Sequence, residues 1–108
     1  MNTWGDKFLS RVFTKKELSY VNKKKFSHEN LAARFACKES VLKAFGDTRV
    51  GISLKNIEIL NDSKGKPEVM LHGEAKKFAS DNKLGKIIVS MSHTSNYAVS
   101  NAILWRDM

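Results

Sequence analysis

The stretch HENLAARFACKESVLKAFG, residues 28–46, is the part of the chain that decides its fold. It is rich in alanine, leucine, lysine and glutamate, which favour a helix, and contains no proline. Gly46 stands where glycine commonly ends a helix, because glycine readily adopts the left-handed backbone conformation found there. We therefore predict a long helix from about His28 to Phe45.

Two rows of side chains on this helix matter for packing and for chemistry. At 100° per residue, the first is an apolar stripe and the second a file along its edge. The stripe consists of Leu31, Phe35 and Leu42, and the file of Ala32, Ala36, Glu39 and Lys43. Glu39 and Lys43 are then expected at the border of the core. Such a pair is often an ordinary helix ion pair, worth about 0.2–0.5 kcal/mol. The small alanines, however, would let a ligand approach, and a carboxylate beside an ammonium suits a divalent cation with phosphate.

The segments on either side predict an α+β domain. A short helix after Thr3 is expected to carry Trp4, Phe8, Leu9 and Val12. The pattern Thr14-x-x-Glu17 predicts a second helix from Thr14 to near Lys23. Beyond the long helix, the period changes to that of strands. We expect strands at 56–60, 68–71, 86–91 and 97–105, turns at 61–67 and 92–96, and a helix at 74–82 whose Ala75, Phe78 and Ala79 point inward. The predicted fold is one domain, residues 1–108, with an antiparallel sheet packed on the long helix.

Composition narrows the functional classes. The chain has 108 residues, of which 42% are hydrophobic, enough for one modest core but not for a multidomain enzyme. The lone cysteine, Cys37, cannot form an internal disulfide, so we expect a reducing, cytoplasmic setting. The longest apolar runs fall far short of the roughly 20 residues that cross a bilayer, so no membrane association is predicted.

The net charge of +8 is unevenly distributed. Residues 1–54 carry 11 basic and 5 acidic side chains, whereas residues 55–108 carry 8 and 6. Such a surface attracts nucleic acid, phosphorylated cofactors or an acidic protein, although excess lysine can also simply maintain solubility. Because the sequence lacks an aromatic-rich strand motif or a recognition-helix signature, we do not predict nucleic-acid binding.

Two polar segments could contact a ligand. The run Ser90-Met91-Ser92-His93-Thr94 follows a predicted strand, and its hydroxyls, imidazole and backbone amides suit phosphate or ribose recognition. By itself it also fits a polar hairpin loop, and Gly65-Lys66-Pro67 fits a hairpin turn. His28 and His72 have no partner at ligand spacing and are interpreted as structural.

Three segments in order resemble the holo-acyl-carrier-protein synthases, the small bacterial-type 4'-phosphopantetheinyl transferases. Residues 34–46 resemble the family signature Phe-x-x-Lys-Glu-Ala/Ser-x-x-Lys-Ala. Upstream, Arg11-Val12-Phe13-Thr14 with Glu17-Leu18 resembles the preceding family segment. Downstream, Ile57-Glu58-Ile59 and Gly65-Lys66-Pro67 are similar to the middle hairpin, and residues 90–94 with Tyr97-Ala98 are similar to the Ser-x-Ser-His-Thr end. The resemblance covers nearly the whole chain.

The resemblance implies Mg²⁺-dependent transfer of 4'-phosphopantetheine from coenzyme A to a serine of apo-acyl carrier protein, releasing adenosine 3',5'-bisphosphate. It implies that Glu39 ligates the metal and helps to deprotonate the serine, and that Lys43 neutralises phosphate charge. The implied coenzyme A site consists of Lys43, Gly46, Lys66, Pro67, Ser92, His93 and Thr94. Lys7, Arg11 and Arg34 would face an acidic carrier protein. A homotrimer is also implied, with Ala33, Cys37, Val41 and Ala44 available for its contacts.

One departure from the family pattern concerns the N-terminal side. Family members open with a strand carrying Gly-x-Asp-Ile/Val, whose aspartate is a second metal-binding carboxylate, and no residue here matches it. Asp6 has a different sequence context and receives no such role. We therefore expect Met1 to be an internal methionine of a longer protein. The alternative is an inactive, truncated descendant that only binds acyl carrier protein.

Overall fold

A computed structural model describes residues 5–24, 27–46, 51–93 and 98–106, and confirms the α+β class. The helices and strands follow the predicted order, with boundaries that differ by a few residues. They are α1 (Asp6–Val12), α2 (Lys15–Asn22), α3 (Ser27–Ala44), the short 3-10 helix η2 (Leu54–Asn56), β1 (Ile57–Asn61), β2 (Pro67–Leu71), α4 (Gly73–Asp81), β3 (Leu84–His93) and β4 (Ala98–Arg106).

The predicted capping box starts α2. The Thr14 side chain accepts a hydrogen bond from the Glu17 backbone N–H, and the Glu17 carboxylate accepts one from the Thr14 N–H. Each side chain thus satisfies a backbone donor that the first turn of a helix leaves without a partner. This confirms the predicted start of the second helix.

The strands form two antiparallel pairs. In β1–β2, Ile57 lies opposite Leu71 and Asn61 opposite Pro67. In β3–β4, the register runs to His93 opposite Ala98, so β3 extends two residues beyond the predicted strand and shortens the expected 92–96 loop. The antiparallel sheet is therefore divided into two two-stranded sheets within the described residues.

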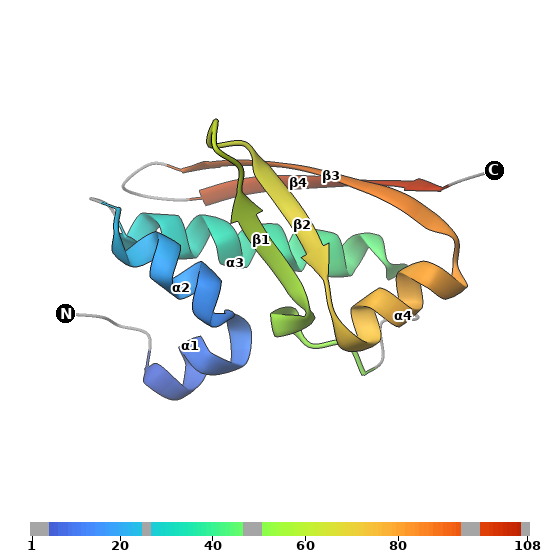
Figure 1. Ribbon diagram of the computed structural model, residues 1–108, viewed down its shortest axis with the longest axis horizontal. Coiled ribbons are helices and arrows are strands. Elements are labelled where there is room, and N and C mark those ends of the chain that lie inside the picture. The colour runs from blue at the N-terminus through green and yellow to red at the C-terminus, as the bar shows by residue number, and fades with distance from the viewer. Residues whose placement is uncertain (1–4, 25–26, 47–50, 94–97, 107–108) are drawn as a thin grey trace.

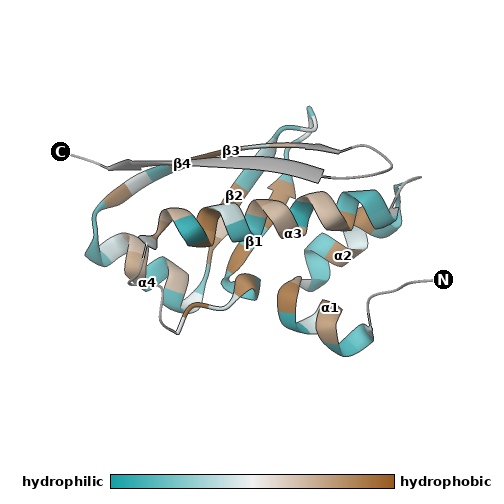
Figure 2. Cartoon of the chain, turned by 180° about the vertical axis from the view of Figure 1, so that it is seen from behind, coloured by the Kyte–Doolittle hydropathy of each residue, from teal (hydrophilic) through white to brown (hydrophobic). Residues whose placement is uncertain are grey.

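Helix α3 lies along the β3–β4 pair, and the β1–β2 hairpin crosses α3, with α1 and α2 on one side of the hairpin and α4 on the other (Figure 1). Figure 2 shows the same arrangement from behind, with apolar segments on α1, α3 and β1. Two buried clusters fill the interior. One joins the C-terminal half of α3 to β1 and α4, and the other joins α1 and α2 to the N-terminal part of α3. The first comprises Cys37, Val41, Phe45, Ile57, Ile59 and Ala75, and the second Leu9, Val12, Phe13, Val21 and Leu31.

The buried face of α3 differs from the predicted one. Phe35 and Leu42 are only half-buried, whereas Ala33, Cys37 and Val41 lie in the core. The suggestion that this second apolar arc serves contacts between protomers is therefore wrong for these three residues, because hairpin β1–β2 and its neighbours already cover them. On α4, Ala75 and Ala79 are buried as predicted. No helix in the described ranges is long and apolar enough to span a membrane.

Candidate active site

Glu39 and Lys43 lie on the exposed face of α3. Both side chains are exposed rather than at the border of the core, because the helix is rotated toward its Cys37–Val41 side. They are one helical turn apart, so a carboxylate and an ammonium face solvent side by side. The arrangement presents both charges to an external ligand.

Another face of α3, about 100° around the helix from Glu39, carries a buried ion pair. Lys38 Nζ lies 2.7 Å from Glu17 Oε1, and both side chains are fully buried. The same ammonium donates to the backbone oxygens of Leu54 at 3.0 Å and Ile57 at 2.6 Å. All three ammonium donors are thus used. Burial lowers the pKa of Lys38, and the Glu17 carboxylate opposes this shift.

Glu17 connects this pair to two further elements. Its Oε1 accepts from the Thr14 backbone at the start of α2, and its Oε2 accepts from the Ile59 N–H at 2.8 Å in β1. A single carboxylate therefore joins α2, α3 and β1. The capping pattern predicted one of these contacts, but neither the bond to β1 nor the pairing with Lys38 has a local sequence signal.

Glu58 of β1 is the centre of a second polar cluster, which includes Thr14 and His72. It accepts hydrogen bonds from the Thr14 hydroxyl and pairs with His72 Nε2, which lies 3.0 Å from its Oε1. Burial alone would raise the pKa of Glu58, but the bonds from Thr14 and His72 and the charges of His72 and Lys16 outweigh it and lower that pKa. His72 thus has a partner, fourteen residues away in sequence, consistent with a structural role.

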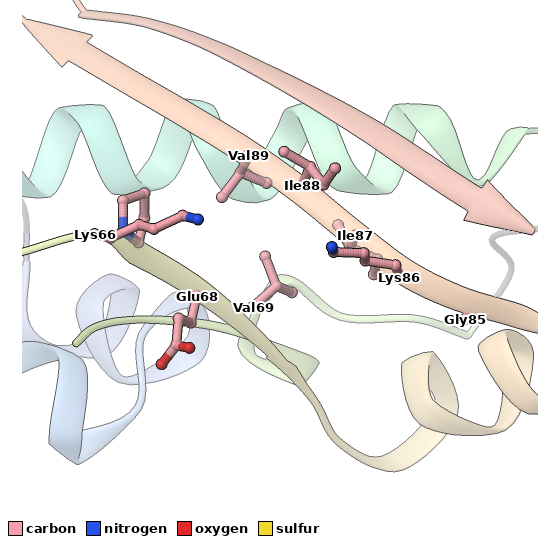
Figure 3. Close-up of a pocket in the computed structure, with 9 residues that line it drawn as sticks. Lys66, Glu68, Val69, Gly85, Lys86, Ile87, Ile88 and Val89 are labelled. Atoms are coloured by element: carbon pink, nitrogen blue, oxygen red, sulfur yellow. The ribbon is translucent and has the colours of Figure 1, made fainter.

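The β1–β2 turn brings Lys66 and Pro67 to a cavity of about 370 Å³ between β2 and β3. The cavity is lined on one side by residues 66–69 and on the other by residues 85–89. Figure 3 shows the amino groups of Lys66 and Lys86 beside it, with Val69 and Val89 between them and Ile87 next to Lys86. Its lining combines an apolar floor with two lysines and Glu68, whose carboxylate points away from the two amino groups (Figure 3). This surface suits an anionic ligand that also has apolar parts.

The remaining residues predicted for the coenzyme A site are distributed along the chain. Gly46 follows α3 with a φ of +82°, as expected for a helix-ending glycine. Ser92 and His93 are the last residues of β3 and pair with Val99 and Ala98. Thr94 lies outside the described residues.

The predicted site residues form two groups. Glu39, Lys43 and Gly46 lie toward the C-terminal end of α3, whereas Ser92 and His93 lie at the end of β3. Strand β3 runs against the direction of α3, so its C-terminal end lies where α3 begins, while the C-terminal end of α3 lies toward α4 (Figures 1 and 2). Glu39 and Lys43 stand on the last turns of α3, about 18 Å or more along the axis from its first residue. The chain by itself therefore does not bring Glu39 and Lys43 together with the end of β3.

The residues predicted to contact the carrier protein differ in their exposure. Lys7 and Arg11 are exposed on α1. Arg34, by contrast, is 2% exposed, and its guanidinium donates to the Asn61 side chain. The expectation that Arg34 faces a carrier protein is wrong, because Arg34 is buried against Tyr20 of α2 and Asn61 of β1.

The donor set for a metal ion is sparse. Among the described residues, no three His, Cys, Asp or Glu side chains gather around one point. Glu39 nevertheless fits Mg²⁺, because this ion is commonly bound by one or two carboxylates together with substrate phosphates and water.

Comparison with known proteins identifies the class. The family model of the 4'-phosphopantetheinyl transferase superfamily matches residues 2–102. The chain therefore belongs to this superfamily, as the motifs predicted.

Its relatives define the type of transferase that it resembles. A holo-[acyl-carrier-protein] synthase from Thermoanaerobacter sp. (strain X514) is 45% identical over 99 residues, covering 92% of this chain and 72% of the relative. The solved structure of the corresponding synthase from Neisseria meningitidis matches with a TM-score of 0.82 at 29% identity, covering 94% of this chain and 82% of that one. The synthase from Helicobacter pylori, solved in complex with coenzyme A, matches with a TM-score of 0.74 at 26% identity, covering 91% and 81%.

Proposed function

We propose that this chain is a holo-acyl-carrier-protein synthase that uses coenzyme A and Mg²⁺. The observation that carries the proposal is the exposed Glu39–Lys43 pair on α3, in a chain that belongs to the transferase superfamily. The names of its relatives support the acceptor, and the coenzyme A complex of the Helicobacter pylori synthase supports the donor.

The reaction is a phosphoryl transfer. The serine oxygen of apo-acyl carrier protein attacks the phosphorus that bears the pantetheine arm. A new O–P bond forms, the pyrophosphate P–O bond breaks, and adenosine 3',5'-bisphosphate leaves. The serine proton must be removed, and the Glu39 carboxylate can accept it directly or through water.

Glu39 and Lys43 would divide the electrostatic work. Glu39 would hold Mg²⁺, which when bound polarises the phosphate and stabilises its developing negative charge. Lys43 would add a fixed positive charge one helical turn away. Because both groups stand on one rigid helix, their spacing is set before the substrates bind.

The donor site would be formed by Gly46, Lys66, Pro67, Ser92, His93 and Thr94. The cavity beside Lys66 and Pro67 supports this assignment, because its cations and apolar floor match a molecule with phosphates and an aromatic ring. The exposed Lys7 and Arg11 would meet the carrier protein, which we propose to be acidic.

We further propose a homotrimer with the active site between protomers. The separation of the Glu39–Lys43 face from the end of β3 supports this assembly. If both groups serve one active site, the end of β3 would come from a neighbouring protomer.

The test is a mass-spectrometric assay with purified chain, apo-acyl carrier protein, coenzyme A and Mg²⁺. We expect the carrier protein to gain the mass of phosphopantetheine, and EDTA to stop the gain. Glu39→Gln should remove it, whereas Glu74→Gln, a matched change at an exposed glutamate of α4, should not. Absence of any gain, with the carrier protein still bound, would overturn the synthase proposal in favour of a protein that only binds the carrier.

A further inference from the structure

Arg34 links α3 to the β1–β2 turn through a relay of side chains. Its Nη2 donates to Oδ1 of Asn61, the last residue of β1. The Asn61 side-chain nitrogen in turn donates to the backbone oxygen of Gly65, at 2.9 Å. A buried cation of the helix is thus connected, through one amide side chain, to the inside of the turn.

The turn itself is tightly organised by Asp62. Its Oδ1 accepts from the backbone N–H groups of Lys64 and Lys66, both at 2.9 Å, and its own N–H donates to the Lys66 oxygen, also at 2.9 Å. Gly65 adopts a φ of +85°, which glycine tolerates without strain. Asn61 therefore attaches an already ordered turn to the body of the domain.

The environment of Arg34 is poor for a residue that serves stability alone. Its side chain stacks on the Tyr20 ring at 4.8 Å, and burial lowers the pKa of Arg34. Its Nε has no hydrogen-bond partner in the described part of the chain. Burying a charge with an unsatisfied donor is costly, although the Glu17 carboxylate and a hydrogen bond with Tyr20 offset part of that cost.

We propose that Arg34 is a positioning residue, which holds the 62–66 turn through Asn61 and so fixes Lys66 and Pro67 at the cavity between β2 and β3. Its consequence for coenzyme A rests on the proposed function, because Lys66 and Pro67 belong to the proposed donor site. The ordering of the turn does not depend on that function and can be measured separately.

The first measurement is amide hydrogen exchange of the full chain, compared between wild type, Arg34→Met and Asn61→Asp. Asn61→Asp keeps an acceptor for Arg34 but removes the donor to the Gly65 oxygen, so it breaks only the second link. We expect exchange in residues 62–66 to accelerate by about tenfold in both variants, with α3 unchanged in Asn61→Asp. Lys64→Met, which removes an exposed charge from the same turn, should leave exchange at the wild-type rate.

Unchanged exchange at the turn in Asn61→Asp would overturn the proposal, and this variant decides the matter even if Arg34→Met fails to fold. Uniformly faster exchange along the whole chain in both variants would also overturn it, because it would indicate a purely structural role.

The second measurement separates the Michaelis constants of the two substrates. Displacing Lys66 and Pro67 should raise KM for coenzyme A by about tenfold in Asn61→Asp and leave KM for the carrier protein near the wild-type value. The reverse pattern would overturn the positioning role in favour of carrier docking. If wild type transfers nothing, the proposed function fails, and hydrogen exchange still decides whether Arg34 orders the turn.

Discussion

Helix α3 carries two pairs of charged residues, each spaced by one helical turn, in opposite environments. Arg34 and Lys38 are buried at 2% and 0% exposure and bonded to β1, η2 and α2, whereas Glu39 and Lys43 face solvent. Among the described residues, no hydrogen bond or ion pair engages the side chain of Glu39 or Lys43. The comparison teaches that spacing alone does not tell a charge that holds the fold from one that is available to a ligand.

The difference has a physical cause. A buried charge loses its hydration, so it must be surrounded by fixed partners. Lys38 satisfies this condition through Glu17 and two backbone oxygens. An exposed charge keeps its water and can exchange that water for a metal ion or a phosphate. Changes to Lys38 should therefore alter stability, and changes to Glu39 or Lys43 should alter chemistry.

The largest effect is expected from Lys38→Met. It leaves the Glu17 carboxylate buried without its counter-charge, and we expect the free energy of unfolding to fall by about 3–5 kcal/mol. Urea denaturation measures this loss. The double variant Glu17→Gln with Lys38→Met should recover part of it, since no unpaired charge remains although glutamine can accept only one of the two backbone N–H bonds. A loss below about 1 kcal/mol for Lys38→Met would contradict the proposed division between the two pairs.

Glu39→Gln, on the exposed face of α3, should reduce the transfer rate and leave stability unchanged, the opposite of Lys38→Met. We expect the rate of phosphopantetheine transfer to fall by at least about 100-fold, close to 2.7 kcal/mol of transition-state stabilisation. The free energy of unfolding should change by less than about 0.5 kcal/mol, as for other surface positions. Full transfer activity in this variant would remove Glu39 from the mechanism.

Charge reversal on α1 extends the comparison to the carrier protein. Arg11→Glu should raise KM for the carrier protein by about tenfold, equivalent to 1.4 kcal/mol, and leave KM for coenzyme A unchanged. The effect should weaken at high salt, because exposed charges are screened. Lys76→Glu, the same change at an exposed position of α4, is the control. An equal rise for both variants would indicate only the effect of net charge.

The smallest effect is expected from Glu58→Gln, which should change how the free energy of unfolding depends on pH. Because the pKa of Glu58 is lowered in the folded state, the unfolded chain binds a proton more readily as pH falls. The carboxylate therefore stabilises the fold above the unfolded pKa of about 4.3, and this contribution is lost as pH falls through the lower folded value. Glu58→Gln should remove about 1 kcal/mol at pH 7 and much less at acid pH. A constant difference across the pH range of an unfolding series would contradict this origin.

Local features of the sequence predicted the elements well. Thr14 and Glu17 form the capping box expected from their spacing, and Gly46 has the positive φ expected after a helix. Contacts between residues close in sequence are sufficient to set these features. The same holds for the β1–β2 hairpin, whose turn is built within residues 61–67.

The site was predicted less completely. The helical spacing singled out Glu39 and Lys43 as a pair, the resemblance implied their roles, and the structure shows that both face solvent. The burial of Lys38, which precedes Glu39 in the family signature, was not predicted. Arg34 was predicted to face a carrier protein, whereas it is buried. Their partners Glu17, Ile57 and Asn61 lie on other elements. Ile57 is 19 residues from Lys38 along the chain, and Asn61 is 27 residues from Arg34.

The sequence by itself therefore determined the order and approximate positions of the predicted helices and strands, the capping of α2 and the charge pairs along α3. These properties depend on local propensity and on the helical period, which relate residues within a few positions of one another. Only the tertiary structure decided which face of α3 became the core, because that choice depends on where β1, η2 and α2 pack. It thereby made Arg34 and Lys38 internal links and left Glu39 and Lys43 open to solvent.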